Sequence, residues 1–241
     1  MSLRVPMLCY HRIEHPPSNR PLDQNFVSPS RFASHLALLA RWGFTGVTVR
    51  DVTQWQRGAC ELPPRPIAIT FDDAYDSVVH HALPLLAERT WKCTVFVVSS
   101  CIGGTNVWDV QAPRATLLDA TALRAMHDAG HEIGSHSRHH KRITTLSSND
   151  ATAELLDSRT ELEHALGIPI TSFAFPYGTH DPLALTRVRD AGYHAACTLK
   201  RYGNPRNGNS LRMGRMGIGG PLSDAKLTYK LLKLMLTPAR S

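Results

Sequence analysis

Short runs of apolar and β-branched residues alternate along the chain with segments in which apolar residues recur at helical spacing. Helical spacing is clearest in residues 30–42, 76–89, 119–129 and 148–166, and the last of these begins with Ser-Asn-Asp and ends at Gly167. This alternation predicts a parallel sheet with helices packed outside it. The runs with strand character are VPMLCYH, GVTV, PIAITFDD, CTVFVVSS, HEIGSH, TSFAFPYG, HAACTL and, more weakly, LRMGRMGI.

The number of strand-like runs favours a barrel over an open nucleotide-binding sheet. Seven or eight strands in 241 residues suit a closed or nearly closed barrel, and no G-x-G-x-x-G motif follows the first run. The sequence has no evident repeat, low-complexity tract or linker. We therefore expect a single α/β domain over residues 1–241, with a C-terminal amphipathic helix at about 223–236.

The C-terminal segment KLTYKLLKLML allows two interpretations. Its lysines, Lys226, Lys230 and Lys233, could face an anionic membrane surface while the leucines enter the interface. Alternatively, the leucines form the buried face of a terminal helix that packs on the barrel. We favour packing on the barrel, and membrane-surface contact is the weaker alternative.

Composition narrows the classes of function. The net charge is +7, the basic residues are scattered, and no nucleic-acid motif accompanies them, so we expect no nucleic-acid partner. Five cysteines without a C-x-x-C pair argue against a disulfide framework or a thiolate zinc site. No signal peptide and no uninterrupted apolar run of spanning length is visible, so we expect a cytoplasmic protein; a periplasmic or secreted chain whose leader had been removed would look the same.

Polar residues that follow the strand-like runs are the candidates for chemistry, because parallel β/α folds gather their sites at the carboxyl ends of strands. If each run is a strand, these residues meet in one cup. They are His11, Asp72 with Asp73, His136 with His140, and the Pro-Tyr-Gly turn at 176–178.

The segment GHEIGSHSRHH does not fit a helical zinc protease. That motif needs H-E-x-x-H, and the histidine after His131 and Glu132 is His136, five residues from the first. The alternation of this segment favours a strand. His136 and His140 form a better pair, because three intervening residues allow both imidazoles to reach one ion from a strand end and the following turn. By itself the pair could equally be a histidine-rich surface loop.

The adjacent carboxylates in TFDD strengthen the interpretation as a metal site. Two neutral imidazoles and one carboxylate are a typical catalytic zinc shell with an open position for water. A cation bound by Asp73, His136 and His140 would allow both aspartates to stay ionised and would leave Asp72 free to act as a base. The structural alternative is a helix cap after the strand, but one aspartate is sufficient for that.

The motifs TFDDAYD, EIGSHSRHH and FAFPYG, in this order and spacing, resemble the polysaccharide deacetylase (NodB-homology) family, carbohydrate esterase family four. The resemblance runs from about residue 5 to about residue 218. It implies a distorted (β/α)7 barrel that removes N- or O-acetyl groups from sugars with a divalent metal, usually zinc.

The resemblance also implies roles for individual residues. Asp72 corresponds to the general base, and Asp73, His136 and His140 correspond to the metal ligands. Tyr177 corresponds to the residue whose backbone N–H binds the oxyanion.

Two departures from the family pattern point to a subgroup typified by deacetylases of poly-β-1,6-linked N-acetylglucosamine. Ala174 stands where the family commonly has a base-orienting arginine, and the usual acid histidine near the C-terminus is missing because no histidine follows His194. In that subgroup an N-terminal Tyr-His strand end supplies the acid, which here is His11. We expect Arg215 to replace the missing arginine, with Arg212 as the competitor; a buried structural histidine is the alternative for His11.

The sequence therefore predicts a metal-dependent deacetylase that acts on an N-acetylglucosamine-containing glycan or its precursor in exopolysaccharide or cell-surface glycan synthesis. The expected metal is Zn²⁺, with Co²⁺ or Ni²⁺ as alternatives. Two rival functions remain: an amidohydrolase of small non-sugar amides or imides, and a catalytically inactive glycan-binding relative. Trp108 and Tyr75 could stack on a sugar ring, although ordinary packing is the simpler interpretation.

Overall fold

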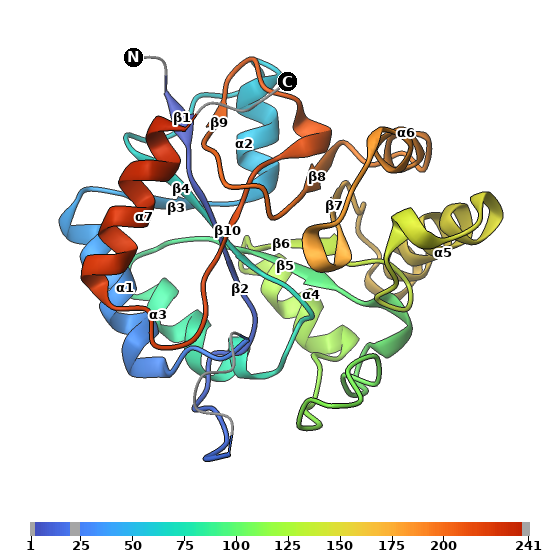
Figure 1. The fold of residues 1–241 in the computed structure, drawn as a ribbon, viewed down its shortest axis with the longest axis horizontal. Coiled ribbons are helices and arrows are strands. Elements are labelled where there is room, and N and C mark those ends of the chain that lie inside the picture. The colour runs from blue at the N-terminus through green and yellow to red at the C-terminus, as the bar shows by residue number, and fades with distance from the viewer. Residues whose placement is uncertain (1–2, 20–24, 238–241) are drawn as a thin grey trace.

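The computed structural model describes residues 3–19 and 25–237, and they form one α/β domain built on a curled parallel sheet (Figure 1). Seven strands of this sheet follow the order β10–β2–β4–β5–β6–β7–β8, and β3 pairs beside the start of β4. The strands are β2 (Met7–Tyr10), β3 (Thr45–Val47), β4 (Pro66–Phe71), β5 (Thr94–Val97), β6 (Glu132–Ser135), β7 (Ser172–Ala174), β8 (Ala195–Cys197) and β10 (Met216–Gly217). A separate antiparallel pair joins β1 (Arg4–Val5) to β9 (Asn204–Pro205).

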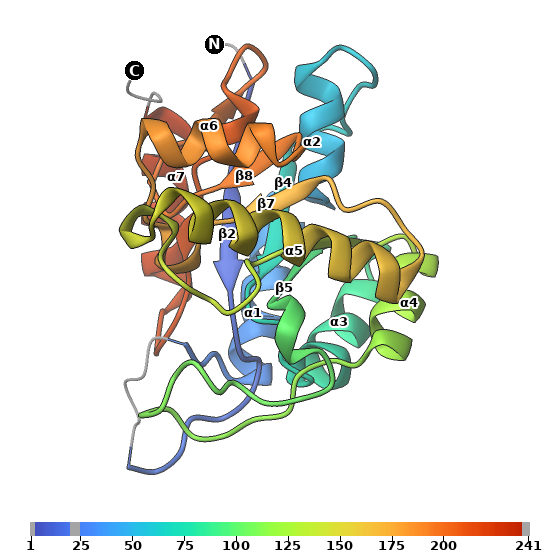
Figure 2. The same ribbon diagram turned by 90° about the vertical axis from the view of Figure 1, so that its right-hand side faces the viewer.

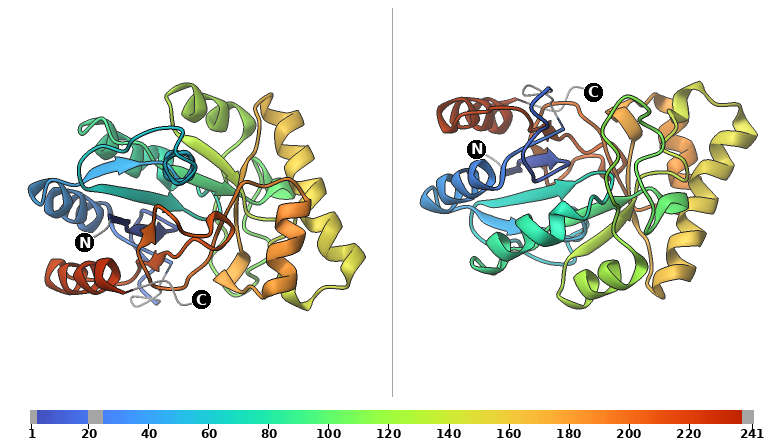
Figure 3. Two further views of the ribbon diagram at one scale, coloured as in Figure 1. Left: turned by 90° about the horizontal axis from the view of Figure 1, so that it is seen from above. Right: turned by 90° about the horizontal axis from the view of Figure 1, so that it is seen from below.

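Helices cover the outside of the sheet (Figures 2 and 3). Most of them begin at a Ser, Thr or Asp whose side chain accepts a hydrogen bond from the first turn. Within the described residues they are α1 (Pro29–Arg41), α2 (Val49–Gln56), α3 (Leu83–Ala87), α4 (Ala120–Asp128), α5 (Ser148–Leu166), α6 (Pro182–Asp190) and α7 (Asp224–Leu236).

The predicted helix boundaries agree best with the structure where the sequence has a capping residue at each end of the helix. Residues 148–166 form α5, with Gly167 in the left-handed conformation at φ 68°. The run GVTV is a strand only as far as Val47. Thr48 instead caps α2 and forms a capping box with Asp51, so a β-branched run ends in a helix start.

The chain segment around Arg215 joins the two ends of the curled sheet. Met213 makes a parallel bridge to Cys197 of β8, and Met216 pairs with Leu8 of β2. The segment therefore completes the ring of strands expected of a distorted (β/α)7 barrel, and Arg215 lies between its two contacts.

Strand alternation decides which side chains point into the barrel. Met7, Ala68 and Phe96 belong to the inner cluster, whereas their neighbours Leu8 and Ile69 belong to the cluster under the helices. Side chains two residues apart in a strand share a face. Every second residue after Met7 and Ala68 therefore also points into the barrel. Cys9 therefore follows Met7, and Thr70 and Asp72 follow Ala68.

The rejected protease motif lies in a strand, as the alternation predicted. Glu132 begins β6 and points into the opposite end of the barrel from His136. Its carboxylate accepts hydrogen bonds from Thr94 Oγ1 at 2.8 Å, Ser172 Oγ at 2.5 Å and the backbone N–H of Arg50 at 2.7 Å. Glu132 thus connects β5, β6, β7 and the first turn of α2.

The C-terminal helix α7 packs on the domain beside α1, as Figure 1 shows. Leu227, Leu231 and Leu234 are buried, whereas Tyr229 and Leu236 are exposed. The leucine face therefore has the packing role favoured from the sequence.

In the described part of the chain, no helix combines the length and the apolar character that crossing a membrane requires.

We expect acid to destabilise the fold through His131. Its Nδ1 accepts the backbone N–H of Cys93 at 3.2 Å, and burial, helped by Lys92, lowers its pKa to about 4. The unfolded chain therefore binds a proton that the folded chain does not, and stability falls as the pH drops from about 6.5 towards 4. The loss from this group is at most about 3 kcal/mol.

Urea unfolding of the chelator-treated protein at pH 7.0 and pH 4.5 measures this loss. His131→Asn keeps an acceptor but cannot titrate, so its stability should change less between the two pH values. His164→Asn, at an exposed position of α5, is the control and should behave like the parent. An unchanged pH dependence in His131→Asn would contradict the assignment.

Candidate metal and catalytic site

The carboxyl ends of the strands surround a cavity of about 340 Å³. It brings together side chains from loops that follow β2, β4, β6 and β7, which are far apart in the sequence. Its lining includes His11, Asp72, Asp73, His136, His140 and Tyr177.

Asp73, His136 and His140 point at one another and fit a divalent cation. Asp73 Oδ1 lies 3.3 Å from His140 Nε2 and 3.6 Å from His136 Nε2, and this buried oxygen has no hydrogen-bond partner in the part of the chain that the structure describes. Ligand atoms about 2.0 Å from a tetrahedral zinc lie about 3.3 Å apart. The spacing, the donor types and the orphaned oxygen therefore fit a metal site.

His136 is fixed in the state that a metal ligand requires. Its Nδ1 lies 2.8 Å from the carbonyl oxygen of Ala174, to which a neutral ring donates, leaving the Nε2 lone pair for the cation. Burial lowers its pKa to about 4, against the opposing effect of Asp72, so the ring is neutral at pH 7. Ala174 therefore contributes its carbonyl where the family commonly places an arginine side chain.

His140 is held between two aromatic side chains. Trp108 stacks on it at 4.9 Å with an interplanar angle of 17°, and Tyr177 meets it edge-on at 4.8 Å. Trp108 thus packs against a predicted metal ligand and also lines the cavity. Tyr75 also lines the cavity, but it is only 2% exposed and packs with its ring 4.9 Å from the guanidinium of Arg12.

The turn that carries His140 depends on a carboxylate from α5. Glu154 accepts the backbone N–H groups of Arg138 at 3.1 Å and His139 at 2.9 Å, and it pairs with His139 Nδ1 at 2.6 Å. Ser137 and His140 flank this contact with φ of 65° and 58°. Glu154 therefore stabilises a backbone conformation that residues other than glycine rarely adopt.

Arg215 binds Asp72 in a bidentate fork. The charge of Asp72 is therefore partly balanced and is not fully available to a cation at the neighbouring site. The Arg215 Nη1 and Nη2 atoms lie 2.6 Å and 2.8 Å from Asp72 Oδ1 and Oδ2. Arg215 is fully buried, and it also donates to Thr70 Oγ1 and the Thr198 carbonyl. Burial alone would raise the pKa of Asp72, but Arg215 outweighs it and holds the pKa well below the usual range.

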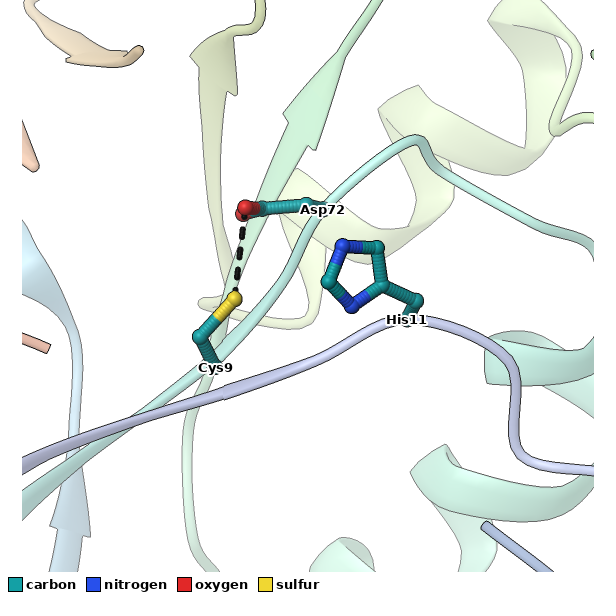
Figure 4. A group of neighbouring side chains, drawn as sticks. All are labelled: Cys9, His11 and Asp72. Carbon is teal, nitrogen blue, oxygen red and sulfur yellow. Dashed lines mark hydrogen bonds between the residues drawn. The ribbon is translucent and has the colours of Figure 1, made fainter. Parts of the chain in front are cut away.

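Cys9 and His11 approach Asp72 from β2 (Figure 4). The Cys9 thiol donates to Asp72 Oδ2 at 3.2 Å, and burial raises its pKa far above the usual value, so the thiol keeps its proton. His11 lines the cavity, and its buried Nδ1 has no partner among the described residues. His11 thus stands beside the Asp72 carboxylate.

Tyr177 occupies a strained turn after β7. Its φ is 60° and its ψ is 7°, whereas its neighbours in the turn, Pro176 and Gly178, suit the tight geometry. Asp73 and Ala74 also have positive φ, so the left-handed conformation recurs around the cavity. Strain of this kind persists where the surrounding structure fixes it, and it is common at functional sites.

The cavity therefore brings together six of the candidate site residues, and Arg215 contacts one of them, Asp72. The six are His11, Asp72, Asp73, His136, His140 and Tyr177. Two contributors were missed. Alternation along β2 would have placed Cys9 beneath His11, so its contact could have been found. Nothing in the sequence near Glu154 indicates that it supports the turn that carries His140. Glu154 reaches this turn only because α5 packs beside it.

Comparison with known proteins agrees with this geometry. The family model for polysaccharide deacetylases matches residues 60–196. A chitin deacetylase of Pestalotiopsis sp. is 32% identical over 137 residues, which are 56% of this chain and 42% of that enzyme. Poly-beta-1,6-N-acetyl-D-glucosamine N-deacetylase of Staphylococcus aureus is 20% identical over 208 residues, covering 83% of this chain and 70% of that enzyme. The chain spans less than half of the chitin deacetylase, so that enzyme's full activity does not transfer directly.

Solved structures agree on the fold. The deacetylase PplD of Streptococcus pyogenes superposes with a TM-score of 0.81 and 20% identity, over 98% of this chain and all of that one. IcaB from Ammonifex degensii gives a TM-score of 0.79 and 24% identity, over 94% of this chain and 96% of that one. These identities support the architecture alone. The family model covers more than half of the sequence, and the chain therefore belongs to the polysaccharide deacetylase family.

Proposed function

We propose that this protein hydrolyses the acetamide of an N-acetylglucosamine-containing glycan or glycan precursor. The observation that carries the proposal is the division between two adjacent aspartates. Asp73 faces two imidazoles at cation-ligand spacing, whereas Asp72 is held by Arg215 beside them. Such a pair separates the binding of a metal from the transfer of a proton.

Asp73, His136 and His140 are the proposed metal ligands, and zinc is the expected ion. A divalent cation bound there supplies Lewis-acid polarisation of the acetyl carbonyl and lowers the pKa of water. The neutral state of His136 suits this role because an imidazolium cannot coordinate.

Asp72 acts as the general base in this proposal. Arg215 keeps it ionised in a buried place, and its Oδ2 lies 4.0 Å from His136 Nε2, so a water near the ligands is within its reach. The fork of Arg215 and the thiol of Cys9 restrict the carboxylate to one orientation.

Two further groups complete the reaction. The backbone N–H of Tyr177 donates to the developing oxyanion, and its strained turn fixes the direction of that bond. His11, which follows β2 and lines the cavity with Asp72, donates a proton to the leaving nitrogen. The products are acetate and the free amine of the sugar.

Acetate release from N-acetylglucosamine oligomers, together with metal analysis of the purified protein, tests the proposal. Hydrolysis of small cyclic imides without acetate release would instead favour the rival amidohydrolase. Glycan binding by a protein that retains no metal and shows no turnover would favour the inactive relative.

Asp72→Asn should lower kcat by about 10²–10⁴-fold while the protein still binds zinc, because the amide cannot accept a proton. Zinc content and acetate release are measured on the same preparation. Asp73→Asn is the matched variant and should lose the metal. If Asp72→Asn loses metal and Asp73→Asn keeps it, the two roles are exchanged.

Arg215→Lys should shift the acidic limb of the kcat/KM profile to higher pH. Without the fork, burial raises the pKa of Asp72 and is opposed less strongly, so the base becomes protonated at a higher pH. The profile of acetate release from pH 4 to pH 9 measures the shift. Arg212→Lys, in the neighbouring turn, should leave the profile in place, and an unshifted Arg215→Lys profile would argue against this role.

Glu154→Ala should weaken zinc affinity by about 10–100-fold, since the loss frees the turn that carries His140. Titration with zinc or cobalt measures this change without reference to activity. Glu163→Ala removes another carboxylate of α5, which contacts Arg159 and the Ile170 backbone instead. This control should lower thermal stability but keep the metal affinity. Equal metal affinities in the two variants would contradict the role of Glu154.

A further inference from the structure

A second cavity, of about 460 Å³, adjoins the metal and catalytic site. Trp108, His140 and Tyr177 line both cavities, so the two spaces meet across the ring of a proposed metal ligand. Both volumes lie within the range of roughly 300–1,000 Å³ that is usual for ligand sites. Beyond the shared residues, the second cavity is lined by His139, Lys141, Arg142, Thr145 and Leu146.

The two cavities differ in charge. The first contains the carboxylates Asp72, Asp73 and Asp109. The described lining of the second has no carboxylate and includes Lys141 and Arg142. A ligand that extends from one to the other would therefore meet acidic groups at one end and cationic groups at the other.

Arg142 is fixed in place by neutral partners. Its guanidinium lies 3.9 Å from the centre of the Tyr177 ring, and Nη1 donates to Thr179 Oγ1 at 2.8 Å. Arg138, four residues from it in the same loop region, is instead bound to Asp157 at 3.2 Å and Glu161 at 2.7 Å. No carboxylate of the described chain lies within 4.0 Å of Arg142, so its remaining N–H groups and its charge are available to a ligand.

Lys141 adds a second, weaker positive charge. Its Nζ lies 3.8 Å from Glu154 Oε1, which balances part of the charge, and its side chain is 55% exposed. Arg142 is therefore the main recognition group. A planar guanidinium stacked on an aromatic ring is well suited to carboxylate or phosphate oxygens, because its orientation is already set.

We propose that the second cavity is a subsite for an anionic group on the unit next to the acetylated sugar. The group is a carboxylate, as in a uronic acid, or a phosphate, as in a phosphate-linked precursor. This inference rests on the proposed deacetylase function and narrows its substrate class from neutral glycans to anionic ones. Tyr177 connects the two events, since its backbone faces the reaction while its ring supports Arg142.

Three compounds that share an N-acetylglucosamine unit test the proposal. One is the neutral dimer, one carries a hexuronic acid as the neighbouring unit, and one carries a 1-phosphate. We expect a KM about five- to tenfold lower for at least one anionic compound than for the neutral dimer, which is the size of one charge-assisted contact at a partly exposed site. The better of the two anionic compounds identifies the source of the charge.

Arg142→Gln and Lys141→Gln should reduce the ratio of kcat/KM values, anionic over neutral, towards one. Arg41→Gln removes the same charge from the last turn of α1, outside both cavities, and should keep the parent ratio. Raising the salt concentration should lower the ratio in the parent and in Arg41→Gln.

Failure of this inference is distinguishable from failure of the proposed function. Turnover of the neutral dimer with no anionic preference, or a preference that survives in Arg142→Gln, overturns the subsite and leaves the deacetylase intact. If none of the compounds is hydrolysed, calorimetric titration of the same compounds decides. Tighter binding of an anionic compound, lost in Arg142→Gln, supports the subsite, and equal binding of all three overturns it.

Discussion

The buried fork between Arg215 and Asp72 is the interaction on which the rest of the site depends. Both groups are almost fully removed from water, so each would be costly without the other. Arg215 also lies on the segment that joins β8 to β2. The short segment that closes the sheet, through Met213 and Met216, therefore also carries the residue that keeps the carboxylate ionised. A barrel that failed to close would leave Asp72 buried without a counter-charge, and it would take up a proton.

The same fork explains how two neighbouring aspartates can serve different purposes. Asp72 continues the inward column of β4 and meets Arg215 inside the barrel. Asp73 follows a left-handed backbone step, at φ 74°, that turns it towards His136 and His140. Adjacent residues of a regular strand would point to opposite faces of the sheet. The strained step after β4 is what allows both carboxylates to face one cavity while Asp72 binds Arg215 and Asp73 faces the two histidines.

Sequence reasoning succeeded where the information lies in the strands. The apolar runs marked where β2, β4, β6 and β7 end, and a parallel sheet brings such ends together. Arg215 was found because a motif position held Ala174 and a late strand offered an arginine. Reasoning failed where a contact depends on loop conformation or helix packing. The positive φ of Ser137 and His140, and the reach of Glu154 from α5, follow from no periodicity. Likewise, Trp108 stacks on His140 only because its long loop folds back over the site.

In the proposed function, the charges of the site would favour first the binding of a cation and then the formation of an oxyanion. Asp72, Asp73 and Arg215 together leave one net negative charge in a place shielded from water, which favours entry of a cation. With a divalent ion at Asp73, the balance would become one net positive charge. That surplus would favour the negative oxygen that develops in the proposed attack on an acetyl group. In the proposed reaction the contribution of Arg215 is to keep Asp72 ionised, so that a base stays available beside the cation site.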